Sequence, residues 1–569
     1  MARTFAIGVQ DFEEIISKNN FYVDKTLFIK EWWESDDKVT LITRPRRFGK
    51  TLNMSMLERF FSVKFKGQSE IFEGLDICRE EKYKELQGTY PVIFLSFANV
   101  KENNYIGAKA HIFQILEDLY TEYIFVKKAG ILEENEEEYF ERIKQGMSDI
   151  DAAVALNQLS KYLYRYYGKK VIILLDEYDT PLQEAYAEGY WKEIVPFIRV
   201  LFNSAFKTNP YLERAIMTGI TRVSKESLFS DLNNLKVAAI TSNKYASCFG
   251  FTEEEVFASM DEFGMTNRDD VKKWYDGFTI GNLKDIYNPW SIINFLDEGK
   301  LKTYWANTSS NILISNLIRE ANKSVKVKME ELLNHNSIVC EIDEEIVFNS
   351  LGEDENAIWS LLLTSGYLKV LSVDEDYYEL VITNYETEKM FRRMVKKWFR
   401  RSGSNYNEFI EALLSADVDL MNEYMNRFAE AMFSFFDGGK KPYKKSSPEK
   451  FYHGFVLGML VDLQGRYEVT SNRESGLGRY DVMLRPLNNY DDGIILEFKV
   501  FNSVKENSLE ETVQAAINQI EEKKYEQTLL NQGIEKERIR KYGLAFEGKK
   551  VLIGEVYTFN RANLLQNIS

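Results

Sequence analysis

Short apolar runs alternate with longer amphipathic segments over roughly the first 220 residues. The apolar runs are typical of buried strands and lie at 39–43, 91–97, 171–175 and 214–219. The segments between them carry apolar residues at helical spacing, at about 50–61, 103–167 and 190–206. Strands separated by helices predict a parallel sheet with helices on both faces.

The pattern changes from about residue 250, where short amphipathic helices alternate with isolated strand-like runs. Within it, 360–370 (SLLLTSGYLKV) predicts helix, turn and strand. We interpret this region as a helical or winged-helix-like lid and connector.

The last 120 residues or so predict a separate α/β domain. Its expected order is helix, three strands, helix and two strands, at about 448–463, 466–471, 479–485, 493–500, 508–525, 541–547 and 550–557. Polar stretches at 401–407 and, more clearly, 438–450 are candidate boundaries. The expected division is 1–250, 251–437 and 445–569.

Composition narrows the class of protein. The 569 residues are too many for one hydrophobic core. A net charge of −16 argues against a protein that coats DNA along its whole surface. An acidic protein can still bind nucleic acid in a local basic groove. The odd count of three cysteines fits a reducing cytosol. The chain shows no signal peptide and no run of about 18 apolar residues, so we expect no contact with a membrane.

The strand at 39–43 leads into RPRRFGKT (44–51), which has the parts of a phosphate-binding loop. Gly49 allows close approach of the backbone, Lys50 reaches the β- and γ-phosphates, and Thr51 ligates Mg²⁺. Arg44 stands where such a loop usually has its first glycine. The candidates to contact phosphate directly are therefore the side chains of Arg44, Arg46 or Arg47. Phe48 belongs to the same predicted binding loop. The alternative is a chance tripeptide at a helix start.

A second half-site follows the strand at 171–175. Asp176 and Glu177 would stand at the carboxyl edge of the sheet, where open α/β folds bind ligands. We expect Asp176 to hold the Mg²⁺ shell and Glu177 to orient or deprotonate the attacking water. The alternative is a strand that ends in a charged turn. Asp179 is best interpreted as an ordinary turn residue, and the alternative is a residue that supports the site without touching the ligand.

A third strand end lies beside the same predicted site. In MTGITRVS (217–224), Thr218, Thr221 or Arg222 is placed to sense the γ-phosphate. A polar strand end without function explains this segment equally well.

Together FYVDKT (21–26), RPRRFGKT, LLDEYD and TGITRVSKESLFSDLNNL resemble the bacterial AAA-ATPase-like family of P-loop proteins, over about residues 5–280. The resemblance implies an ASCE-type P-loop NTPase fold that binds ATP with Mg²⁺. It places 21–26 near the adenine. The family's arginine-rich loop likewise lacks the first glycine.

A carboxylate–lysine cluster is predicted near the C-terminus. Asp481 and Glu497 come together if their strands pair, and Glu497 and Lys499 share a strand face because they are two residues apart. Two carboxylates bind Mg²⁺, and a lysine positions water, as phosphodiester cleavage requires. The alternative is a salt bridge at a sheet edge.

The segments SNRESGLGRYDVML, ILEFKV and QAAINQIEEKKY resemble the PD-(D/E)XK nuclease superfamily over about 447–557. The resemblance implies that Asp481, Glu497 and Lys499 are the core residues, with Gln519 in support. Weaker candidates are Glu468, Glu474 and His453, the last of which is more typical of a packed helix residue.

Three functions follow for the whole chain. The first is an ATP-regulated, metal-dependent nuclease acting on nucleic acid, DNA more than RNA. The second is an ATP-dependent switch or scaffold whose nuclease-like domain binds without cleaving. The third is nucleotide binding without hydrolysis. A homo-oligomer is compatible with each. Lysines 440, 441, 444 and 445 form a small basic patch that a solvated linker explains best.

Overall fold

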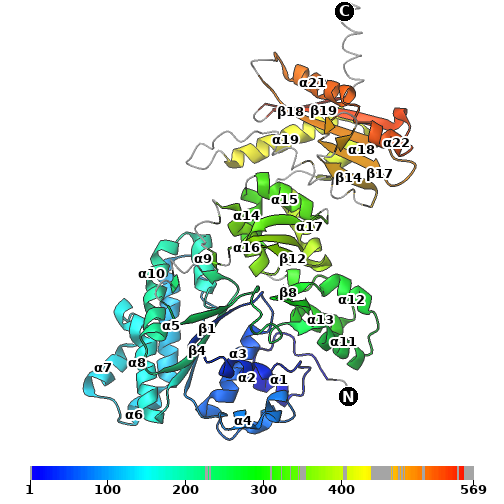
Figure 1. The fold of residues 1–569 in the computed structure, drawn as a ribbon. Helices are drawn as coiled ribbons and strands as arrows, with labels where there is room; N and C mark the ends of the chain where they lie inside the picture. Colours follow the sequence, from blue (N-terminus) through cyan, green and yellow to red (C-terminus); the bar gives the residue numbers. More distant parts are fainter. Residues whose placement is uncertain are drawn as a thin grey trace, which may run out of the picture. The chain divides into compact units, whose positions relative to one another are not determined.

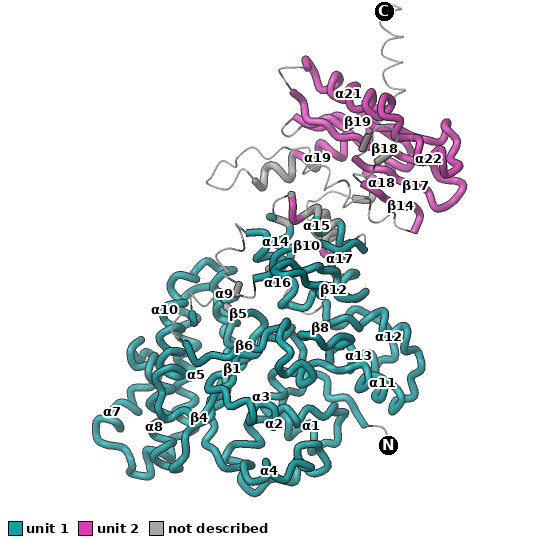
Figure 2. The backbone as a smooth tube through the Cα atoms, viewed as in Figure 1, with its two compact units in different colours: residues 1–321, 328–390 teal, residues 322–327, 391–569 magenta. Residues whose placement is uncertain are grey.

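The computed structural model divides the chain into two compact units. Unit 1 contains residues 1–321 and 328–390, and unit 2 contains 322–327 and 391–569 (Figure 2). The structure describes residues 3–555 except 224–227, 230–231, 308–310, 322, 334, 344, 347–350, 352–353, 401–405, 437–455, 457–459, 461–462, 464, 472–473, 476–477, 480, 503–505 and 548–549.

A five-stranded parallel sheet forms the centre of unit 1. The alternation of strands and helices predicts the parallel sheet and four of its strands, but not the strand at 235–238. Its spatial order is β2-β3-β4-β1-β6. The strands are β1 (Val39–Thr43), β2 (Val92–Ser96), β3 (Val171–Asp176), β4 (Leu212–Gly219) and β6 (Leu235–Ala238). Every residue of β3 is buried, which is why its sequence is an unbroken apolar run.

Helices cover both faces of this sheet (Figure 1). On one side lies α3 (Lys50–Phe61), which directly follows the loop after β1. On the other lie α5 (Tyr105–Glu122), α8 (Asp149–Tyr167) and α10 (Trp191–Phe202). The carboxyl ends of β1, β3 and β4 therefore meet at one edge, beside the start of α3.

The rest of unit 1 contains two small antiparallel sheets as well as helices. The first has the order β7-β9-β8, from β7 (Phe251–Thr252), β8 (Phe278–Ile280) and β9 (Leu283–Tyr287), and α13 (Pro289–Glu298) follows it. The second has the order β10-β13-β12, from β10 (Ile338–Glu341), β12 (Leu368–Asp374) and β13 (Tyr377–Ile382). Helix α16 (Glu355–Thr364) precedes β12, in agreement with the helix, turn and strand predicted at 360–370.

Unit 2 is built on a mixed five-stranded sheet with the order β14-β17-β18-β19-β20. Its strands are β14 (Tyr467–Ser471), β17 (Val482–Pro486), β18 (Gly493–Val500), β19 (Ile539–Glu547) and β20 (Lys550–Glu555). Strands β18 and β19 are parallel, and the other pairs are antiparallel. Helix α21 (Leu509–Glu522) joins β18 to β19 and packs on both.

The core of unit 2 extends beyond the segment expected for the C-terminal domain. Residues of α18 (Tyr406–Ser415) and α19 (Val418–Phe436), such as Phe409 and Tyr424, share a buried cluster with β17 and β18. The linker expected at 438–450 lies outside the described residues, and so does most of the helix expected at 448–463. The three-part division of the chain therefore remains a prediction.

Candidate functional site

The loop after β1 turns sharply into α3. Gly49 is the N-cap of α3 and has φ 82°, a left-handed conformation that glycine adopts without strain. Arg47 also has a positive φ, 65°. Lys50 begins the helix and is only 4% exposed. Its Nζ donates hydrogen bonds of 3.1 Å to the carbonyls of Arg44 and Pro45, so the ammonium lies under the loop.

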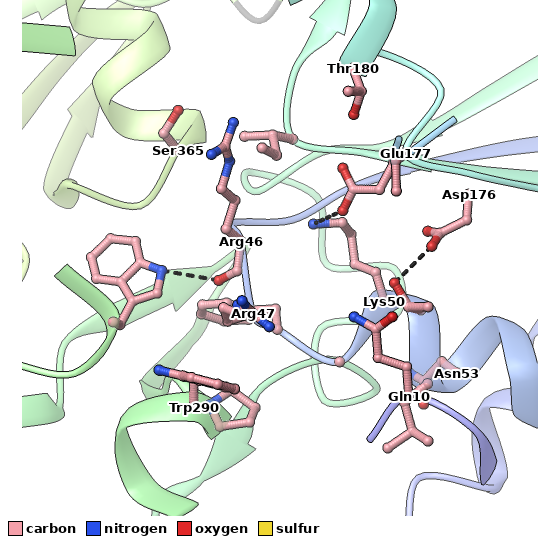
Figure 3. Close-up of a pocket in the computed structure, with 18 of the residues that line it drawn as sticks. Gln10, Arg46, Arg47, Lys50, Asn53, Asp176, Glu177, Thr180, Trp290 and Ser365 are labelled. Carbon is pink, nitrogen blue, oxygen red and sulfur yellow. Dashed lines mark hydrogen bonds and ion pairs between the residues drawn. The ribbon is translucent and has the colours of Figure 1, made fainter. Parts of the chain in front are cut away.

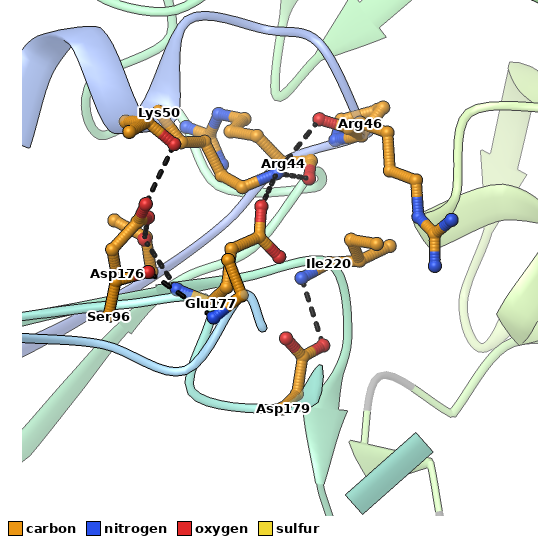
Figure 4. Close-up of polar contacts among 12 residues, drawn as sticks. Arg44, Arg46, Lys50, Ser96, Asp176, Glu177, Asp179 and Ile220 are labelled. Carbon is orange, nitrogen blue, oxygen red and sulfur yellow. Dashed lines mark hydrogen bonds and ion pairs between the residues drawn. The ribbon is translucent and has the colours of Figure 1, made fainter. Parts of the chain in front are cut away.

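The two acidic residues after β3 face this loop (Figure 4). Thr51 Oγ1 donates to Asp176 Oδ2 over 2.7 Å, and Thr218 of β4 donates to the other oxygen of the same carboxylate. Glu177 Oε1 lies 3.6 Å from Lys50 Nζ. Burial, and secondly the neighbouring Glu177, raise the pKa of Asp176. The structure thus brings the predicted lysine, threonine and acidic pair together.

Lys50, Thr51, Asp176 and Glu177 line a cavity of about 1050 Å³ in unit 1, which is large enough for a nucleotide. Thr218 is buried behind Asp176 and is not part of the lining. Its lining includes 46–53 of the loop and α3, Asp176, Glu177 and Thr221. Phe21, Tyr22, Val23 and Lys25 also line it, so the segment that the family resemblance places near the adenine borders the same cavity.

The three loop arginines point to different places. The Arg44 side chain is fully buried, and its guanidinium donates to the carbonyls of Thr43, Ala238, Ala239, Lys244 and Tyr245. It therefore holds the loop to the chain after β6, and the structure does not support its expected contact with phosphate. Arg47 lies over the ring of Trp290, 4.2 Å from the centroid. Arg46 donates to Gln183 and borders the cavity (Figure 3).

Two more predicted residues have side chains that pack elsewhere in unit 1. Phe48 borders the cavity, but its side chain is buried and packs edge-on against Phe278 at 4.9 Å. Arg222 lies on β5 (Arg222–Val223), which pairs with β11 (Glu345–Ile346), and it borders a separate small cavity. The position of Arg222 does not favour the phosphate contact expected for it.

Several residues bordering the cavity were not anticipated from the sequence. The backbone carbonyl of Arg46 accepts two hydrogen bonds of 3.1 Å, from Asn288 Nδ2 and from Trp305 Nε1. Trp290 and Trp305 both line the cavity, as does Gln10 from the N-terminal segment. No local pattern marks these residues, because they reach the loop only through folding: Gln10 lies in an earlier segment, and Asn288 and Trp305 lie 242 and 259 residues after Arg46.

Asp179 has a larger role than a turn residue. It is fully buried, and its Oδ2 accepts hydrogen bonds from the backbone N–H groups of Ile220 and Thr221, at 3.0 and 2.9 Å. Burial, together with the Glu177 charge, raises the pKa of Asp179. The carboxylate therefore fixes the turn that follows β4. Its sequence signal, one Asp after a Tyr, is indistinguishable from that of a solvated turn.

The donor set at this site fits a magnesium ion. A hydroxyl and a carboxylate are the hard oxygen ligands that Mg²⁺ takes beside phosphate oxygens. Thr51 and Asp176 supply them, and their hydrogen bond shows that both atoms face one point. They are the residues that would hold the ion.

The predicted cluster of unit 2 also assembles. Strands β17 and β18 pair, with Val482 opposite Leu496, so Asp481 and Glu497 come together. Asp481 Oδ2 accepts from the N–H of Phe498 over 2.8 Å. Gln519 of α21 bridges the site, because its amide nitrogen donates to Glu497 and its oxygen accepts from Lys499 Nζ at 2.7 Å.

Electrostatics at this cluster favour a protonated Glu497. Burial, helped by the Asp481 charge, raises the pKa of Glu497 to about 8, and the side chain is 3% exposed. Two carboxylates fit a divalent cation, although the described residues hold no group of three or more His, Cys, Asp or Glu side chains suited to a metal. Asp481 and Glu497 are the residues that would hold it.

Of the three weaker candidates, the structure places Glu468 and Glu474 on strands. Glu468 is paired with Arg485, whose Nε lies 2.6 Å from Glu468 Oε2. Glu474 lies on the short strand β15 (Glu474–Ser475), which pairs with β16 (Gly478–Arg479). His453 falls outside the described residues, and so does the basic patch at 440–445.

Among the helices of the described residues, none has the length and apolar character needed to cross a bilayer.

Comparisons with known proteins give two family matches. Residues 6–229 match the model described as predicted AAA-ATPase, and 447–556 match the PD-(D/E)XK nuclease superfamily. A curated protein from Azotobacter chroococcum mcd 1, described as an uncharacterized protein in the vnfD 5' region, is 27% identical over 317 residues. The match covers 55% of this chain and 56% of that protein's length.

A solved structure also matches, but its backbone superimposes poorly on this chain. It is a Signal Transduction ATPase with Numerous Domains (STAND) protein with a tetratricopeptide repeat sensor from Pyrococcus horikoshii, at 12% identity. The match covers 78% of this chain and 54% of that one, with a TM-score of 0.22, which is too low to support any inference. The family matches and the two assembled sites agree: the chain joins a domain of the predicted AAA-ATPase family to a domain of the PD-(D/E)XK nuclease superfamily.

Proposed function

We propose that unit 1 binds ATP with Mg²⁺ in the cavity beside Lys50 and hydrolyses it. The observation that carries this proposal is the 3.6 Å approach of Lys50 Nζ to Glu177 Oε1 beside the Thr51–Asp176 hydrogen bond. Lys50 and the N–H groups at the start of α3 bind the phosphates. Glu177 orients the attacking water and accepts its proton. Bound Mg²⁺ neutralises charge on the phosphate oxygens.

The sharpest test separates binding from turnover. We expect the full-length protein to bind ATP and release phosphate, and Lys50→Ala to weaken ATP binding by about tenfold or more. Glu177→Gln keeps the shape of the side chain but is a poor base, so it should bind ATP while phosphate release falls by roughly 100-fold or more. ATP binding without phosphate release by the wild type would favour nucleotide binding alone, and no binding would reject the proposal.

For unit 2 we propose metal-dependent cleavage of nucleic acid, DNA rather than RNA, controlled by the ATPase domain. Asp481 and Glu497 hold the cation, Lys499 positions the water, and Gln519 orients both Lys499 and Glu497.

The three cysteines are unpaired, which suits work in a reducing cytosol. Control by ATP requires that the nucleotide favour one state of the protein over another.

Cleavage is tested with a panel of single- and double-stranded DNA and RNA, each with Mg²⁺ or Mn²⁺ and with or without ATP. The wild type should cut at least one substrate, while Asp481→Ala and Lys499→Ala should not. Equal residual cleavage by wild type and both variants would assign the activity to a contaminant and reject the nuclease.

A second candidate function is binding of nucleic acid without cleavage. It is favoured by the hydrogen bonds already made inside the cluster, where Glu497 accepts from Gln519 and Asp481 accepts from the backbone of Phe498. A cation has to compete with these donors. Calorimetric titration with Mn²⁺ discriminates the two, because binding lost in Asp481→Ala favours the enzyme and absence of binding favours the scaffold.

A further inference from the structure

Arg46 borders the cavity, and its guanidinium is held there by a neutral side-chain amide. Its Nη2 donates to Gln183 Oε1 over 3.2 Å. Gln183 belongs to α9 (Thr180–Glu188) and lines the same cavity. Figure 3 shows the guanidinium beside Ser365, on the far side of the loop from Asn53. A guanidinium held by a neutral amide is available to a charged acceptor, which binds it more strongly.

Gln183 connects Arg46 to a buried carboxylate. Its amide nitrogen donates to Asp179 Oδ2 over 2.8 Å, while its oxygen faces Arg46. Both ends of the amide are therefore used, and its orientation is set by the cation on one side and the anion on the other.

Asp179 fixes the backbone turn that follows β4. Its Oδ2 accepts from the N–H of Ile220 (Figure 4) and from the N–H of Thr221. It also accepts from Thr221 Oγ1 at 3.0 Å. Thr221 and Ile220 both line the cavity. One continuous series of hydrogen bonds thus runs from Arg46 through Gln183 and Asp179 to the turn after β4. Thr218, near the end of the same strand, donates a hydrogen bond to Asp176.

We propose that Arg46 senses the terminal phosphate of a bound nucleoside triphosphate by exchanging Gln183 for that phosphate. The proposal rests on the nucleotide binding proposed above. A phosphate oxygen is a charged acceptor and displaces a neutral amide from a guanidinium. Arg46 then leaves Gln183, and the change reaches the turn of Ile220 and Thr221 through Asp179. A diphosphate has no terminal phosphate at this place and leaves the Arg46–Gln183 bond intact.

The test is the ratio of ADP to ATP dissociation constants, measured by titration calorimetry on the full-length protein with Mg²⁺. We expect Arg46→Ala to lower this ratio by about tenfold, through weaker ATP binding with ADP binding unchanged. Arg47→Ala removes the same charge from the same loop, but its side chain lies on Trp290, so the ratio should change by less than about threefold. Gln183→Leu frees Arg46 from its competitor and should raise the ratio.

The outcomes separate this proposal from the one on which it rests. A wild type that binds neither nucleotide rejects nucleotide binding itself. A wild type that binds both equally, or an Arg46→Ala variant that keeps the ATP preference, overturns only the sensing role. Equal losses in Arg46→Ala and Arg47→Ala indicate a general effect of loop charge and overturn it too. A lower ratio in Gln183→Leu contradicts the exchange. Unchanged melting temperatures exclude misfolding as the cause.

Discussion

The hydroxyl of Thr51 donates a hydrogen bond of 2.7 Å to Asp176 Oδ2, although the two residues are 125 positions apart in the chain. The contact forms because β1 and β3 are both bonded to β4 and run in the same direction. Their carboxyl ends therefore reach the same edge of the sheet, where the start of α3 meets the acidic pair. The four predictions that follow use such contacts between distant segments.

The first prediction concerns the hydroxyl of Thr51. Thr51→Ala removes the only hydroxyl that donates to Asp176 Oδ2 among the described contacts, and with it the expected magnesium ligand. We expect the Mg²⁺ concentration for half-maximal ATP turnover to rise by about tenfold or more. Thr51→Ser keeps the hydroxyl and is the matched control. Equal magnesium dependence in both variants would exclude a ligand role for Thr51.

The second prediction concerns pH and the buried Glu386. This carboxylate accepts from Ser291 Oγ at 2.7 Å and from the N–H of Ala306 at 3.3 Å. Burial raises its pKa from 4.5 to about 7, so the folded protein binds this proton more tightly than the unfolded chain. Unit 1 is therefore destabilised as pH rises from about 4.5 to about 7, by roughly 3 kcal/mol at most.

Glu386→Gln has the shape of the protonated acid and cannot ionise. Its melting temperature, followed by calorimetry, should match the wild type near pH 4.5 and exceed it above pH 7. Parallel curves for the two proteins across this range would show that Glu386 does not titrate as described.

The third prediction concerns Gly219 at the end of β4. A Cβ at this position would lie 2.7 Å from Asp179 Oδ1 and 2.7 Å from a ring carbon of Tyr178, and both side chains are fully buried. Gly219→Ala should destabilise unit 1 by about 1–3 kcal/mol, because neither side chain has room to move. Calorimetry measures the shift of the unit 1 transition.

Gly107 provides the control for this substitution. It lies in the first turn of α5, where a Cβ would meet the side chain of the partly exposed Glu102. Gly107→Ala should be neutral or stabilising, since alanine is the better helix former. If both alanine variants melt at the same temperature as the wild type, the packing around Gly219 is looser than the structure indicates.

The fourth prediction concerns Gln519 in unit 2. Gln519→Ala leaves Lys499 and Glu497 without the amide that joins them. We expect cleavage to fall by about 10- to 100-fold, as for other residues that orient metal ligands. Gln514 is an exposed glutamine of the same helix that bonds Asn518, so Gln514→Ala should leave cleavage unchanged. Cleavage by Gln519→Ala at the wild-type rate would remove Gln519 from the site.

Local patterns in the sequence were enough to predict most elements and the core of each site. The strand at 39–43, the helix at 50–61 and the strand that ends at Asp176 are read directly from unbroken apolar runs and helical spacing. Glycine before lysine and threonine marks the phosphate loop, and the acidic pair at the end of β3 marks the facing half of that site. Glu497 and Lys499 mark the second site because they are two residues apart on one strand.

The tertiary structure alone decided which side chains reach the cavity. Arg44, Arg46 and Arg47 are equivalent in the sequence, yet Arg44 bonds the chain after β6, Arg47 lies on Trp290, and Arg46 faces Gln183. Their partners come from segments about 140–240 residues further along, so no local pattern distinguishes them. Asp179 was underestimated for the same reason, since its burial depends on the turn after β4. Side-chain direction follows from long-range packing, which periodicity along the chain does not encode.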